Sequence, residues 1–141
     1  MNKLKIGDCI VFNEEHPCKV TKINKSAPGK HGSAKYSIFG KSLLTSKTHS
    51  AVYGHHDKPS YVTTMRENYL GYYVDSENYC ELTLDDESGD KTMDMKLNDE
   101  FVKLAKAYED GFVVEVTTLK YLKKGKETID YFASKISKIE D

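Results

Sequence analysis

The segment SAPGKHGSAK at residues 26–35 combines the residue types most suited to chemistry in this chain. Pro28 followed by Gly29 satisfies a type II turn, which needs a φ of about −65° at the proline and a positive φ at the glycine. Gly32 permits a second unusual backbone conformation. We therefore predict a shaped loop with Lys30 at its tip, holding a charged amine in solvent.

Three further side chains make the surroundings of this loop basic. Lys25, His31 and Lys35 flank the tip, and we expect them, with Lys30, to contact phosphate or ribose. An ordinary hairpin tip with solvated lysines is the alternative that these residue types leave open. A phosphate-binding P-loop is excluded, because its motif requires glycine where Asn24 stands and a hydroxyl where His31 stands.

Charge is distributed unevenly along the 141 residues, although the whole chain is almost neutral at −1. Residues 1–66 carry eleven basic and four acidic side chains, for a net charge of +7. Residues 67–141 carry ten basic and eighteen acidic side chains, for a net charge of −8. This split predicts a basic domain over 1–66 that faces nucleic acid and an acidic domain over 67–141. Two solvated surfaces that merely differ in composition are the alternative.

Short apolar clusters between turn signals predict strands in the first half, in which Ala34, Tyr36 and Ile38 alternate with their neighbours. Close spacing of short strands favours a small barrel, because a barrel removes exposed sheet edges. The segment 63–69 has little apolar content and is expected to be a linker. The expected clusters are 9–12, 18–23, 34–39, 42–44 and 60–62.

The second half predicts three strands, one helix and two strands, which is the order of an oligonucleotide-binding barrel. Asn98 or Asp99 caps the helix, and Gly111 suits its end. The whole chain is therefore predicted to be mostly β, with two small barrels. The expected helix face is Leu97, Phe101, Leu104, Ala105 and Tyr108. The expected elements are strands 69–75, 79–85 and 91–97, helix 98–108, and strands 112–122 and 127–132.

Other reactive residues do not form a recognisable catalytic arrangement, so the chain is not expected to be an enzyme. Cys9, Cys18 and Cys80 lack metal-binding spacing and are interpreted as small buried reduced thiols. Adjacent histidines in the turn 55–57 point apart, so no metal is expected there. The six tyrosines between 53 and 79 are read as half-buried packing residues, with base stacking as the alternative. No stretch is long enough for a membrane span or a signal peptide.

The loop and its preceding strand together resemble the signature of eukaryotic and archaeal translation factor 5A, a family related to bacterial elongation factor P. The resemblance rests on GKHGSAK at 29–35, preceded by HPCKVTKINKS at 16–26. Weaker similarities are LLTSKT at 43–48, GHHD at 54–57 and the helix at 98–108. The resemblance implies an SH3-like barrel followed by an oligonucleotide-binding (OB-fold) barrel with one helix.

The resemblance also implies a modified lysine at position 30. In the family, this lysine receives an aminobutyl group from spermidine and is hydroxylated to hypusine by deoxyhypusine synthase and deoxyhypusine hydroxylase. The factor itself catalyses nothing and needs no other cofactor. The change roughly doubles the reach of the side chain and adds a second amine with a pKa of about 10.

The implied partners are the large subunit of the 80S ribosome, ribosomal RNA and the P-site peptidyl-tRNA in the cytoplasm. Hypusine would hold the acceptor end of the tRNA in a reactive arrangement at stalled sites such as consecutive prolines, since orientation alone lowers such barriers. An unmodified RNA-binding double-barrel paralogue is the alternative. A small enzyme that uses His and Cys is a second alternative.

Overall fold

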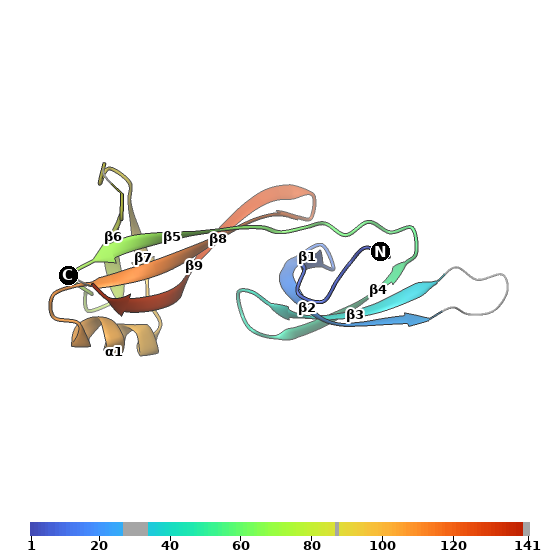
Figure 1. Ribbon diagram of the computed structural model, residues 1–141, viewed down its shortest axis with the longest axis horizontal. Helices are drawn as coiled ribbons and strands as arrows, with labels where there is room; N and C mark the ends of the chain where they lie inside the picture. Colours follow the sequence, from blue (N-terminus) through green and yellow to red (C-terminus); the bar gives the residue numbers. More distant parts are fainter. Residues whose placement is uncertain (27–33, 87, 140–141) are drawn as a thin grey trace. The chain divides into compact units, whose positions relative to one another are not determined.

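The computed structural model describes residues 1–26, 34–86 and 88–139 (Figure 1). Most of these residues lie in β-strands, and the described part of the chain contains one helix, so the prediction of a mostly β protein is confirmed. Two compact units are present. The first is Met1–Thr63 with Leu119–Ile129, and the second is Thr64–Thr118 with Asp130–Asp141.

The first unit is built on a four-stranded antiparallel meander in the order β1-β2-β3-β4 (Figure 1). The strands are β1 (Cys9–Phe12), β2 (His16–Ser26), β3 (Lys35–Ser42) and β4 (Thr48–Gly54). Residues 60–62 then run antiparallel beside β1, where Ser60 accepts from the Val11 amide and Val62 donates to the Cys9 carbonyl, both at 2.9 Å. The sheet therefore curls into a half-barrel, consistent with an SH3-like barrel.

Alternation along the strands puts the core of the first unit on one face of the curled sheet. Along β3, Tyr36, Ile38 and Gly40 are buried, while the intervening side chains are more exposed. Gly40 faces Phe12, whose ring would lie 2.7 Å from an added Cβ, so glycine is required for this close packing. The buried residues of this core are Met1, Leu4, Ile10, Phe12, Cys18, Val20, Tyr36 and Ile38.

Two strand predictions for the first half need correction. Residues 42–44 are not a separate strand, because Ser42 ends β3 and its hydroxyl accepts from the amides of Leu44 and Thr45 to form a turn. The strand β4 was not predicted, because Ala51 and Tyr53 are its only partly buried hydrophobic side chains and Val52 points into solvent. Backbone pairing with β3 holds β4 in place.

The second unit is a five-stranded sheet with one helix, in the order β7-β6-β5-β8-β9 (Figure 1). The prediction that residues 63–69 form a linker is wrong, because this segment forms most of β5. Most side chains of this segment are exposed, so its residue pattern does not indicate a strand, although it lies between β6 and β8 in the sheet. The elements are β5 (Thr63–Gly71), β6 (Tyr79–Leu84), β7 (Thr92–Lys96), α1 (Asp99–Ala107), β8 (Phe112–Lys123) and β9 (Lys126–Lys138).

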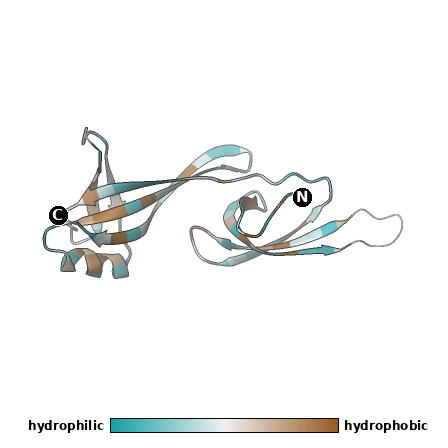
Figure 2. Ribbon diagram, viewed as in Figure 1, coloured by the Kyte–Doolittle hydropathy of each residue, from teal (hydrophilic) through white to brown (hydrophobic). Residues whose placement is uncertain are grey.

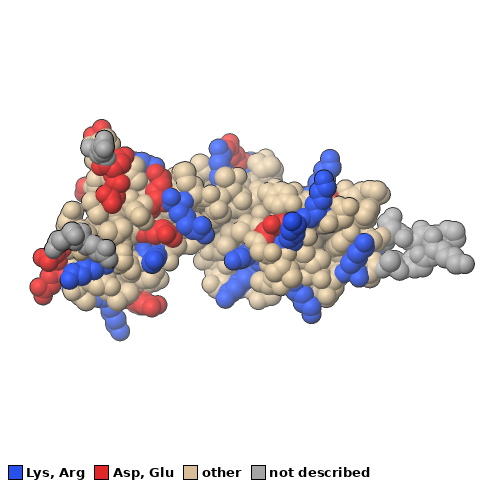
Figure 3. Space-filling model, viewed as in Figure 1, with Lys and Arg blue, Asp and Glu red and all other residues tan. Residues whose placement is uncertain are grey.

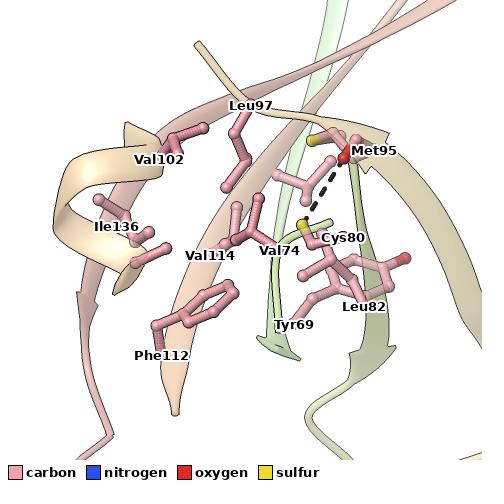
Figure 4. Close-up of a cluster of buried hydrophobic side chains, with 12 residues drawn as sticks. Tyr69, Val74, Cys80, Leu82, Met95, Leu97, Val102, Phe112, Val114 and Ile136 are labelled. Carbon is pink, nitrogen blue, oxygen red and sulfur yellow. Dashed lines mark hydrogen bonds between the residues drawn. The ribbon is translucent and has the colours of Figure 1, made fainter. Parts of the chain in front are cut away.

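The core of the second unit lies between the sheet and α1, where the strands carry their most hydrophobic residues (Figure 2). Phe112 and Val114 on β8 face Leu82 on β6, and all three are almost completely buried (Figure 4). The Cys80 thiol donates to the Met95 carbonyl at 3.6 Å. The other buried members are Tyr69, Val74, Leu97, Val102, Ala105, Val116 and Ile136.

The helix follows the sequence prediction closely. Asn98 is its N-cap, since its side-chain oxygen accepts from the Phe101 amide at 2.8 Å, so the choice between Asn98 and Asp99 falls on Asn98. Tyr108 is the C-cap, and Gly111 (φ +112°) closes the following turn into β8. Of the predicted helix face, Leu97 and Ala105 are buried, and Phe101, Leu104 and Tyr108 are partly buried and pack against the core. Val102 is a further buried residue of the helix that the predicted face does not include. Among the described residues, no helix is both long and apolar enough to cross a membrane.

Candidate functional site

Strands β2 and β3 frame the loop that the sequence singled out. Ser26 pairs with Lys35 at the last position of the hairpin, and Lys25 pairs with Tyr36 one position earlier. The two lysines predicted to flank the loop therefore stand one register position apart on adjacent strands, and both are exposed. The remaining predicted residues, which are Pro28, Gly29, Lys30, His31 and Gly32, lie outside the described residues.

Aromatic rings support the lysines of this hairpin. The Lys25 ammonium lies 5.8 Å from the centroid of the Tyr36 ring, and the Lys22 ammonium lies 5.7 Å from that of Phe39. Such contacts attract a cation through the negative face of the ring. Tyr36 is itself buried, at 4% exposed, so the ring beneath Lys25 is part of the core. The buried Tyr36 ring therefore supports the exposed ammonium of Lys25.

The central strand β3 carries Lys35 between two neighbours, because Lys35 pairs with Ser26 on β2 and with Gly54 on β4. A tight turn follows Gly54, whose amide donates to the Asp57 carboxylate at 2.7 Å. The Tyr36 hydroxyl is 3.4 Å from Nδ1 of His55 in the same turn. The end of the sheet therefore brings the loop-flanking lysines close to the 55–57 turn.

One basic pair on this sheet was not identified from the sequence. Lys19 and Lys41 are direct partners across β2 and β3, and both are exposed. Like charges at directly opposite positions destabilise a sheet. No acidic side chain forms an ion pair with either of them in the described part of the chain. An anionic partner would offset this repulsion. The sequence alone does not reveal that Lys19 and Lys41 are opposite one another, because this depends on the strand register.

The surface charge of each unit follows the uneven distribution in the sequence. On the face of the first unit seen in Figure 3, lysines are spread over the β-sheet with few acidic groups among them. The second unit shows many Asp and Glu side chains mixed with lysines (Figure 3). A field of one sign on the first unit suits attraction of a polyanion such as RNA.

The two buried cysteines, Cys18 and Cys80, are poorly suited to act as nucleophiles. Burial raises the pKa of Cys18 to about 11, with a further contribution from the neighbouring Cys9, and burial raises the pKa of Cys80 to about 11 as well. Both thiols are therefore protonated near neutral pH, and a protonated thiol is a poor nucleophile. Cys18 and Cys80 are buried, as the sequence predicts, whereas Cys9 is only partly buried. Among the residues that the structure describes, no three His, Cys, Asp or Glu side chains are grouped to hold a metal ion.

The fold and the basic hairpin thus define a two-unit β protein whose first unit is suited to nucleic acid. Residues 1–56 match the family model described as translation initiation factor 5A-like, N-terminal. The translation initiation factor 5A of Pyrococcus horikoshii is 42% identical over 52 residues, which is 37% of each chain. That of Picrophilus torridus is 38% identical over 53 residues, or 38% of this chain and 40% of the relative.

Solved structures extend the similarity over most of the chain. A translation initiation factor eif-5a family protein from Naegleria fowleri has a TM-score of 0.68 and 29% identity, and the match covers 92% of both chains. The eukaryotic translation initiation factor 5A from Methanococcus jannaschii has a TM-score of 0.62 at 20% identity, which shows a shared fold over 91% of this chain and 87% of the other.

These comparisons confirm the resemblance to the translation factor 5A family. In sequence, the family model matches residues 1–56, which lie in the first unit. The matched segment spans less than half the length of the curated relatives. In structure, the resemblance rests on both units, which share their fold with the 5A proteins of Naegleria and Methanococcus.

Proposed function

We propose that this protein is a translation factor that binds the ribosome and acts through a modified lysine at position 30. The observation that carries the proposal is the β2–β3 hairpin, whose last pair, Ser26 and Lys35, delimits the GKHG loop within a domain that matches the 5A model. Lys25 and Lys35 flank the base of the loop as exposed cations.

In this proposal, deoxyhypusine synthase transfers the aminobutyl group of spermidine to the Lys30 amine, and 1,3-diaminopropane is released as the leaving group. Deoxyhypusine hydroxylase then hydroxylates the side chain with an oxidant such as dioxygen that the enzyme supplies. The resulting hypusine is long and has two protonated amines. It reaches the acceptor end of the peptidyl-tRNA in the P site and holds it in a reactive orientation, which lowers the barrier to peptide-bond formation without a chemical group from the factor.

The remaining basic residues hold the protein on its partners. Lys25, His31 and Lys35 contact phosphates of ribosomal RNA or tRNA, which position a protein without reading sequence. The ribosome in question is the 80S particle, bound through its large subunit, and the protein acts in the cytoplasm. It is not itself an enzyme, because its contribution is position and charge.

Reconstituted translation tests the proposal. A reporter messenger with a run of consecutive proline codons is translated with and without this protein purified from its own host, and a messenger with alanine codons in their place is the control. We expect the protein to relieve the pause on the proline messenger only. Relief by protein whose Lys30 is unmodified would favour the unmodified RNA-binding paralogue instead.

A further inference from the structure

A cavity of about 570 Å³ opens on the first unit. The N-terminal segment, the turn after β4 and the extended segment around Tyr61 form its walls. A cavity of this size falls within the range of small-ligand sites. Its lining includes basic and aromatic side chains that can contact an anionic ligand, which are Lys3, His55, His56, Lys58 and Tyr61.

The charged side chains that line the cavity are net positive, because Lys3 and Lys58 outnumber its one acidic residue, Asp57. The Asp57 carboxylate accepts from the Gly54 amide at 2.7 Å, and the backbone carbonyl of Asp57 accepts from the Met1 nitrogen at 2.9 Å. Lys3 and Lys58 are exposed, and within the described residues neither takes part in an ion pair. Two cationic amines are therefore available to an anion.

The two histidines are arranged as neighbouring rings. The hydroxyl of the buried Tyr36 lies 3.4 Å from Nδ1 of His55, which leaves Nε2 as the ring nitrogen that can meet a ligand. His56 contacts His55 edge-on, with ring centroids 5.1 Å apart. The histidines thus add hydrogen-bonding groups beside the lysines.

Tyr61 supplies an exposed aromatic face on a fixed backbone. Its backbone bridges Ile10 on β1, and it is held on both sides, because the Ser60 carbonyl accepts from β1 and the Val62 amide donates to β1. The side chain is nevertheless 53% exposed. In single-strand binding sites, a base stacks on an exposed aromatic ring while lysines next to the ring contact its phosphate.

We propose that this cavity binds one unpaired nucleotide of an RNA strand. Lys3 and Lys58 hold the phosphate, the histidines contact the phosphate or ribose, and Tyr61 stacks on the base. Lys35 pairs with Gly54, directly before the turn that lines the cavity, so the basic surface continues from the cavity to the β2–β3 hairpin. This continuity favours a polymer over a free nucleotide.

The test is fluorescence anisotropy with a labelled single-stranded RNA of about ten nucleotides. All variants are made in the full-length Lys30→Ala protein, so that the result does not depend on hypusine. We expect Tyr61→Ala to weaken binding by about fivefold or more, as loss of one stacked base does. Tyr61→Phe should bind normally, and Tyr73→Ala, which removes an exposed tyrosine of the second unit, is the matched control. Thermal unfolding followed by circular dichroism confirms that each variant is folded.

The lysines are tested by salt dependence. We expect the double variant Lys3→Ala/Lys58→Ala to reduce the slope of log affinity against log salt by about 0.7, since the one phosphate that the two lysines hold contributes about 0.7 in a single strand. The matched control Lys103→Ala/Lys106→Ala, on α1, should leave the slope unchanged.

Three results would overturn the proposal. They are unchanged RNA affinity in folded Tyr61→Ala, duplex RNA that binds as tightly as the single strand, and uridine monophosphate that competes as well as the RNA does. None of these results bears on the role of Lys30, which is absent from every variant. Conversely, a failure of the translation assay leaves this binding experiment unaffected.

Discussion

The ammonium of Lys25 on β2 lies 5.8 Å from the ring centroid of Tyr36, which is its direct partner on β3. Because Tyr36 is buried while Lys25 is exposed, the core of the first unit supports a surface charge at the end of the hairpin. The loop proposed to carry the modified lysine therefore starts from a hairpin end where both backbone and charge are held in position.

The position of Lys25 predicts that Lys25→Ala weakens ribosome binding, because one phosphate contact is lost. The slope of log affinity against log salt should fall in magnitude by about 0.7 to 0.9. Binding of the purified protein to ribosomes, measured at several salt concentrations, checks this. Lys120→Ala is the control, since Lys120 forms an ion pair with Glu127 at 2.8 Å and lies far from the hairpin in sequence. An unchanged slope in Lys25→Ala would contradict the assignment.

Lys30→Arg is predicted to abolish function while keeping the fold and most of the ribosome affinity. Arginine retains the positive charge, but its guanidinium does not accept the aminobutyl group. Translation of the proline-run messenger measures the loss, and Lys47→Arg, a change of the same kind at an exposed lysine in the turn between β3 and β4, is the control. Normal translation through proline runs in the Lys30→Arg protein would refute the proposed function.

The cap of α1 predicts a matched pair of stability effects. Asn98→Ala removes the side-chain oxygen that accepts from the Phe101 amide, and should destabilise the helix by about 1 kcal/mol. Asn98→Asp keeps an acceptor at the same position and should have little effect. Hydrogen exchange at the Phe101 amide distinguishes the two. Equal exchange in both variants would show that the cap does not stabilise the helix.

An exposed ion pair in the first unit predicts a pH effect. The Lys124 ammonium lies 2.7 Å from a Glu15 carboxylate oxygen, and its hydrogen bond and charge lower the pKa of Glu15. A carboxyl with a lowered pKa in the folded state stabilises the fold at neutral pH, and this contribution is lost as the pH falls through that pKa. Lys124→Ala should raise the Glu15 pKa towards its ordinary value, which an NMR titration of the Glu15 carboxyl measures. Lys126→Ala should leave it unchanged, and a Glu15 pKa that stays low in Lys124→Ala would contradict this account.

The parts of the fold that local sequence determines were predictable. The helix could be placed because its cap, Asn98, and its hydrophobic spacing lie within one short segment. Strands β4 and the first part of β5 could not, because their side chains are exposed or only partly buried. Their backbones are held by strand pairing, of β4 with β3 and of β5 with β6 and β8. Strand pairing of this kind leaves little trace in residue types.

The same limit applies to the candidate sites. Lys25 and Lys35 could be predicted to flank the loop, because they are close to it in sequence, and the structure places both at the end of the hairpin. The opposition of Lys19 and Lys41 depends on strand register, and the cavity beside Tyr61 joins the N-terminal segment to a turn more than fifty residues later. Neither arrangement can be inferred from spacing.

Mass spectrometry of a peptide that spans residues 26–35, taken from protein isolated from its own host, decides whether Lys30 is converted to hypusine. We expect fragmentation to place the added mass of a hydroxylated aminobutyl group on Lys30. A peptide in which Lys30 is unmodified throughout would refute the proposed modification.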